Sequence, residues 1–155
     1  MAKRGADAVM ETIDTTSSLL QRLHRDWHGW RRGRLFPARR DFKPEDVAYL
    51  LGWINLIEVS PDPIRFKFRL HGSEVVRLLG YDLTGKFVDE IPRPQHRERV
   101  AALCLKPLTQ RGPTASFENV VLDDRVFRCE TLQLPLSEDA QAINMIIAAY
   151  DFGSR

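Results

Sequence analysis

The sequence predicts an α+β domain built on one five-stranded antiparallel sheet, with helices on one face and an amphipathic helix at the N-terminus. Three observations predict it. Residues 64–71 alternate apolar and basic side chains, as a half-buried strand does. Strand-like segments lie on both sides of a helical stretch over residues 73–105, rather than alternating with single helices. Leucines and tryptophans recur at three- and four-residue steps over residues 19–30, which is typical of a helix.

Length and composition agree with one globular domain. The 155 residues are 43% hydrophobic and 28% charged, and no apolar run approaches the roughly 20 residues of a membrane helix. Two cysteines are too few for a disulfide scaffold, so we expect a cytoplasmic protein with no signal peptide. We divide the chain into a partly ordered arm (1–16), a helix with its connector (17–52) and a core (53–152).

The N-terminal helix is expected to begin near Ser17 and to stop at Gly33. The strand over residues 53–59 and the last strand, within residues 142–152, are apolar on both faces, so this helix must cover one face of the sheet, in its own chain or in a partner's. We predict a homodimer formed through four residues of its apolar stripe: Leu20, Leu23, Trp27 and Trp30.

The remaining elements follow in order. A turn at residues 60–63 joins the first two strands into a hairpin, and a short helix runs from Ser73 to Gly80. A longer helix over residues 95–105 should end or kink at Pro107. The last three strands are predicted at residues 114–122, 125–136 and 142–152, the first two joined by a tight turn.

Four stretches in this order resemble single-domain PAS-like proteins of alphaproteobacteria. A tryptophan-bearing helix runs into Arg-x-Gly-Arg-x-x-Pro-x-Arg-x-Asp-x-x-Pro, which spans Arg31 to Pro44. Phe-x-Phe-Arg-Leu-x-Gly follows at residues 66–72, then Gly-Tyr-Asp-Leu-Thr-Gly at 80–85 and Leu-Pro-Leu-Ser at 134–137. The resemblance implies a PAS fold and a stand-alone, non-catalytic signalling module that dimerises and binds a small ligand or a protein partner.

PAS domains hold ligands between the sheet and its helices, so the resemblance also implies a pocket. The candidate residues are Phe66, Phe68, Leu70, Val76, Leu79, Phe87, Ile91, Val100 and Leu103. The same side chains would equally fill an ordinary core, because periodicity does not distinguish a packed core from a lined cavity. A ligand-free protein-interaction module is therefore an alternative.

No cofactor is required by the sequence. Haem would need a pocket histidine, but His96 has polar helical neighbours and is expected to face solvent. Cys104 and Cys129 lack the Asn-Cys-Arg-Phe context of flavin photochemistry. His24 and His28 have the helical spacing of metal ligands, yet arginines lie one turn further on and would repel a cation, so no metal is predicted.

The connector after the first helix is basic, although the net charge of the chain is only +2. Because Arg31 to Arg40 interleaves with aromatic residues, a nucleic-acid-binding regulator is a second alternative. The resemblance instead implies hinge and docking roles for Arg31, Arg34 and Arg39, paired with acidic groups on the core or on a second subunit.

The sequence does not indicate an enzyme, because it has neither a nucleophile motif nor a phosphate-binding loop. If the protein did catalyse a reaction, polar residues at the rim of the pocket, such as His71 and Thr131, would have to carry it.

Overall fold

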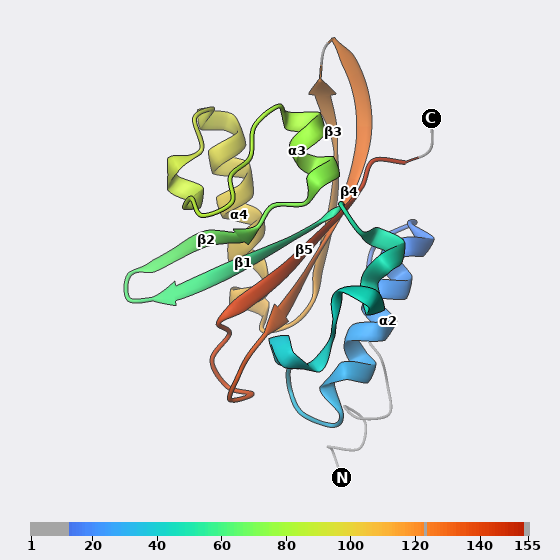
Figure 1. Ribbon diagram of the computed structural model, residues 1–155, viewed down its shortest axis with the longest axis vertical. Coiled ribbons are helices and arrows are strands. Elements are labelled where there is room, and N and C mark those ends of the chain that lie inside the picture. Colours follow the sequence, from blue (N-terminus) through green and yellow to red (C-terminus); the bar gives the residue numbers. More distant parts are fainter. Residues whose placement is uncertain (1–12, 123, 154–155) are drawn as a thin grey trace.

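The computed structural model describes residues 13–122 and 124–153, which form one antiparallel sheet with helices on both faces (Figure 1). The strands are β1 (Ile54–Pro61), β2 (Ile64–Leu70), β3 (Thr114–Leu122), β4 (Arg125–Leu136) and β5 (Met145–Asp151), in the spatial order β2-β1-β5-β4-β3. The helices are α2 (Ser18–Arg31), α3 (Ser73–Leu79) and α4 (Pro94–Gln110), with 3₁₀ turns η1 (Arg39–Asp41), η2 (Pro44–Leu50) and η3 (Val88–Glu90). The predicted fold class is confirmed. Within the predicted arm, residues 1–12 lie outside the described residues.

Helix α2 covers one face of the sheet, which we call the outer face. The Ser17 hydroxyl accepts a hydrogen bond from the Leu20 amide at 3.1 Å and so caps the first turn, while Arg32 ends the helix in the left-handed conformation. The indole N–H of Trp27 donates to the Pro135 carbonyl at 2.9 Å. The outer face consists of the apolar side chains of Ile54, Leu56, Leu132, Leu134, Leu136, Ile147 and Ala149.

Helices α3 and α4, with η3, lie on the opposite face, which we call the inner face (Figure 1). Alternation along each strand separates the two faces: in β5, Ile146 and Ala148 point inward, whereas Ile147 points outward. The inner core consists of Ile57, Phe66, Phe68, Leu83, Val88, Ile91, Val100, Cys104, Ile146 and Ala148.

One local prediction was wrong, and one of the two alternatives predicted for Pro107 is excluded. A β-bulge shifts the pairing of β1 with β2 between Leu56 and Ile57, so that Leu70 pairs with Leu56 and leaves the face that carries Phe68. In α4, Pro107 does not end the helix, which continues to Gln110 with the proline ring buried. A proline removes one backbone donor, and here the packing of α4 on the sheet is sufficient to keep the last turn helical.

Polar contacts fix the start of α2 on the sheet. The hydroxyls of Thr15 and Thr16 both donate to the Glu130 carboxylate, and the Thr16 amide donates to it at 2.8 Å. The Ser17 hydroxyl donates to Asp151 at 2.6 Å. No helix among residues 13–122 and 124–153 is long and apolar enough to cross a bilayer.

Candidate ligand pocket

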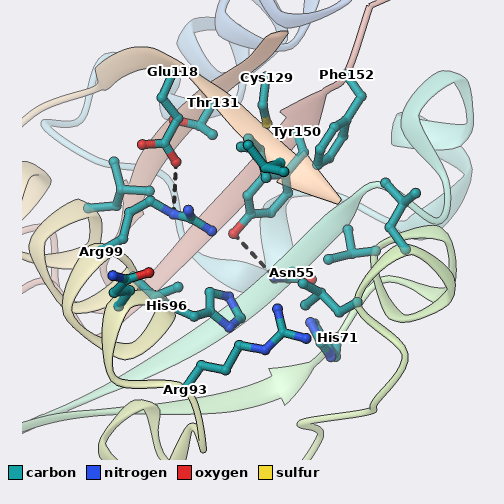
Figure 2. Close-up of a pocket in the computed structure, with 18 of the residues that line it drawn as sticks. Asn55, His71, Arg93, His96, Arg99, Glu118, Cys129, Thr131, Tyr150 and Phe152 are labelled. Atoms are coloured by element: carbon teal, nitrogen blue, oxygen red, sulfur yellow. Dashed lines mark hydrogen bonds and ion pairs between the residues drawn. The ribbon is translucent and has the colours of Figure 1, made fainter. Parts of the chain in front are cut away.

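A pocket of about 310 Å³ lies between the inner face and helices α3 and α4 (Figure 2). One part of its wall is apolar, formed by Phe68, Val75, Leu78, Leu79, Val100 and Leu103. The other part is polar and brings together side chains from both sheet and helices: Asn55, His71, Arg93, His96, Thr131 and Tyr150. The pocket therefore has the mixed lining that small-molecule sites have, and it lies at the small end of their usual size of roughly 300–1,000 Å³.

A glycine allows the chain to turn from β2 into α3 and so positions the neighbouring histidine. Gly72 donates its amide to Asn55 Oδ1 at 2.8 Å, and a Cβ at this position would collide with the backbone of Gly52 and Ile54. Only glycine fits this approach. His71 is thereby held at the strand end, with its side chain in the pocket wall.

His71 is buried, and its hydrogen bonding fixes which nitrogen carries the proton. The Leu83 amide donates to His71 Nδ1 at 3.0 Å, so Nδ1 is an acceptor and the neutral ring has its proton on Nε2. Burial lowers the pKa of His71, and the nearby Asp82 carboxylate offsets only part of that effect. His71 is therefore a neutral donor.

Three polar side chains on the inner face of the sheet extend the polar wall. Asn55 Nδ2 donates to the Tyr150 oxygen at 3.3 Å, and burial raises the pKa of that phenol, which stays protonated. Thr131 is 3% exposed, and its Oγ1 has no hydrogen-bond partner within the part of the chain that the structure describes. A buried hydroxyl without a partner is costly, and such groups are rare in folded proteins.

Helix α4 brings two basic side chains to the pocket, those of His96 and Arg99. Arg99 Nε pairs with Glu118 of β3 at 2.8 Å. His96 Nδ1 is 2.7 Å from the Tyr81 hydroxyl, and burial, with Arg99 as a smaller cause, lowers the pKa of His96 to about 4. The prediction that His96 faces solvent was wrong, because its half-buried ring lines the pocket.

Four of the nine predicted pocket residues line this pocket: Phe68, Leu79, Val100 and Leu103. Phe66 and Ile91 are packed in the inner core instead, and Val76 lies outside the lining. The bulge moves Leu70 to the outer side, and Phe87 packs under the Arg65 guanidinium at 3.5 Å. That this pocket binds a ligand stays a prediction.

Sequence reasoning missed most of the polar wall. Asn55 and Tyr150 each lie in a strand that is otherwise apolar on both faces, and this interruption was the available signal. The sequence gives no signal for Arg93, Arg99 and Glu118, because charged residues in a helix or on a strand are usually solvated. His71 and Thr131, named from the sequence as rim residues, do line the pocket.

The residues predicted to form a dimer interface are used within the chain itself. Leu20 and Leu23 are fully buried and Trp27 is 2% exposed, all against the outer face, and Trp30 stacks on Phe42 with ring centroids 4.6 Å apart. The first three are therefore not available at the surface, because α2 packs on its own sheet. A dimer made through them would require the helix to leave that sheet.

The motif arginines hold the connector together. Arg34 pairs with Asp41 at 2.6 Å, an acidic partner within the motif itself. Arg39 donates to the Phe42 carbonyl at 2.9 Å, and Arg31 lies 5.7 Å from the centroid of the Trp27 ring. Arg34 and Arg39 thus have internal partners, which leaves them less suited to bind phosphates. Among the residues placed by the structure, no three histidines, cysteines or carboxylates form a metal-binding group.

Fold and pocket together define a class of small α+β domain. A helix packs on one face of its sheet, and a pocket lies between the other face and its helices. The PAS domain family model matches residues 15–150, nearly the whole chain, and the chain therefore belongs to the PAS domain family. PAS domains are in general sensory modules.

One solved structure agrees with this fold, and a second is similar at a lower TM-score. The PAS domain of BvgS from Bordetella pertussis has a TM-score of 0.53 and 16% identity, over 70% of this chain and 83% of that chain. A sensory box histidine kinase/response regulator from Burkholderia thailandensis has a TM-score of 0.41 and 14% identity over the same shares. The first likeness shows the fold alone. No curated protein matches this chain.

Proposed function

We propose that this PAS domain is a non-catalytic sensor that binds a small molecule in the inner-face pocket. One observation carries the proposal: the buried Thr131 hydroxyl has no hydrogen-bond partner among the described residues, and it lines a pocket of about 310 Å³. A ligand atom that accepts or donates a hydrogen bond there would remove the cost of burying this group. A filled core would instead leave no such space.

The test compares two tryptophans introduced two residues apart on α4. Leu103 lines the pocket, whereas Leu105 is 44% exposed. Leu103→Trp should fill the cavity and abolish binding, and Leu105→Trp should not. Native mass spectrometry of freshly purified protein should find a bound mass in the wild type and in Leu105→Trp only.

A null result needs a second measurement, because the ligand can be lost in purification. A thermal-shift screen against a library of small metabolites should then raise the Tm of the wild type and of Leu105→Trp, but not that of Leu103→Trp. If no compound binds and no mass is retained, the sensor proposal fails and the ligand-free interaction module is favoured.

A second candidate, docking of a second copy of this chain, is favoured by exposed apolar side chains on the β3–β4 hairpin. Phe117 is 54% exposed, Val121 64% and Val126 67%, and Val121 pairs directly with Val126. Strand β3 is also an edge of the sheet, with backbone groups open to a further strand. A two-fold dimer would bury the same patch on both copies.

Light scattering tests this second candidate. Val121→Lys together with Val126→Lys should convert a dimer into a monomer, whereas Leu35→Lys, a change at a residue that is 53% exposed elsewhere, should leave it intact. A wild type that is monomeric at high concentration would exclude the dimer.

A further inference from the structure

Three acceptor groups of the polar pocket wall already have donors. Asn55 Oδ1 accepts from the Gly72 amide, and His71 Nδ1 accepts from the Leu83 amide. The Glu118 carboxylate is paired with Arg99. Around Asn55 and His71, the groups that can still bind a ligand include the donors His71 Nε2–H and the hydroxyl protons of Tyr150 and Thr131.

One cation at the pocket mouth has no counter-charge. Arg93 lines the pocket as an exposed residue, and within residues 13–122 and 124–153 its side chain has neither a carboxylate nor a hydrogen-bond acceptor as partner. In Figure 2 its guanidinium points toward Asn55 and His71. The other arginine of the pocket, Arg99, is neutralised by Glu118, and both pocket histidines are neutral because burial lowers their pKa. The wall therefore presents one uncompensated positive charge.

From this pattern, and resting on the proposed sensor function, we propose that the ligand is a small organic acid with one carboxylate and an apolar body. The carboxylate would lie between Arg93 and the donors of His71 and Tyr150, since guanidinium and carboxylate groups match in charge and geometry. The apolar body would lie against Leu79, Val100 and Leu103 of the opposite wall. The pocket volume of about 310 Å³ restricts the acid to a compact one.

Two other chemistries fit less well. A cationic ligand would meet the Arg93 charge without an available carboxylate, because Glu118 is taken by Arg99. A phosphate monoester carries nearly two negative charges at neutral pH, and only one arginine is free to compensate them. A single carboxylate matches both the charge and the number of donors.

The experiment uses a matched pair of probes, phenylacetate and phenylacetamide, which differ in charge but hardly in size. Isothermal titration calorimetry on the full chain at neutral pH should find phenylacetate binding at least tenfold more tightly than the amide. Arg93→Gln should weaken phenylacetate at least tenfold and reduce the preference over the amide. Arg77→Gln is the control, since Arg77 is exposed on α3, outside the pocket lining, and its loss changes the net charge equally.

The outcomes separate the two proposals. If the amide binds as tightly as the acid, or if Arg93→Gln leaves the affinity for the acid unchanged, the carboxylate assignment is overturned while the sensor function stands. Tighter binding of phenyl phosphate than of phenylacetate would likewise overturn it in favour of a dianion. If neither phenylacetate nor a panel of linear carboxylates from butyrate to decanoate binds, the organic-acid class is excluded, and the sensor function is judged separately by the bound mass and by Leu103→Trp.

Discussion

The two faces of the same sheet are built differently. In β4 the outward side chains Leu132, Leu134 and Leu136 are fully buried under α2, whereas the inward ones include Thr131 and Gln133. Under α2 the outer face forms an apolar layer, and the inner face is half core and half polar pocket. The difference teaches that the inner face carries buried polar groups, such as Thr131 and Gln133, at a cost that the apolar layer under α2 avoids.

The largest expected effect breaks the outer layer. Trp27→Ala removes a fully buried indole and leaves the Pro135 carbonyl without its donor, so the free energy of unfolding should fall by about 3–5 kcal/mol. Urea denaturation followed by far-UV circular dichroism measures it. Trp30→Ala is the control and should cost clearly less, because Trp30 is only half buried. Equal losses of unfolding free energy in the two variants would show that the burial of Trp27 against the outer face does not stabilise the fold more than the stacking of Trp30 does.

Most of the fold could be predicted from the sequence because alternation and turn residues act locally. The hairpin strands β3 and β4 have the predicted bounds, and α2 begins next to Ser17, where the helical pattern starts. The covering of the outer face by the chain's own helix could not be distinguished from covering by a partner's, since an apolar stripe specifies burial but not the surface that buries it.

The site was harder to predict than the fold. A bulge between Leu56 and Ile57 reverses the side on which Leu70 lies, and no residue in β2 signals it. The charge balance of the pocket depends on which arginine meets Glu118, a pairing between α4 and β3 that only the tertiary structure determines. Periodicity therefore locates the wall, and long-range contacts decide its chemistry.

The second prediction concerns the loss of stability at low pH, and it compares a histidine of α2 with one on the inner face. Burial, with the neighbouring His28 and Arg25 as smaller causes, lowers the pKa of His24 to about 4 in the folded chain. The unfolded chain therefore binds a proton first as the pH falls below about 6.5, and the stability is lost between pH 6.5 and pH 4. At pH 5 the loss from His24 should be about 1–2 kcal/mol, because solvent near the helix surface screens part of it.

Urea unfolding at pH 7.5 and pH 5 checks this sign. His24→Gln should lose less stability than the wild type over that interval. His96 on the inner face has a pKa of about 4 and the same sign, so some pH dependence should remain in the variant. An identical pH dependence in wild type and variant would contradict the role of His24.

The third prediction sharpens the contrast with two threonines of the inner face. Thr131→Val removes a hydroxyl that has no hydrogen-bond partner in the part of the chain placed by the structure, so the free energy of unfolding should stay constant or rise by up to about 1 kcal/mol. Thr114→Val removes the donor to Gln133 Oε1, at 3.1 Å, and should lower it by about 1 kcal/mol. A clear loss of stability in Thr131→Val would mean that its hydroxyl is satisfied in the folded protein.

The smallest expected effect lies at the surface beside the inner face. Arg65 makes two bonds of 2.9 Å to Asp89 and lies over Phe87, which ties β2 to the segment that roofs the inner core. Because the pair is exposed, Arg65→Ala should lower the Tm by no more than a few degrees at low salt and by less at high salt. Differential scanning calorimetry at two salt concentrations measures both, with Arg69→Ala, which loses a single bond of 3.1 Å to Glu58, as the matched control. A large fall in Tm that does not depend on salt would contradict this expectation. It would show that the packing of η3 on the inner face depends on the Arg65–Asp89 pair more than on the apolar core.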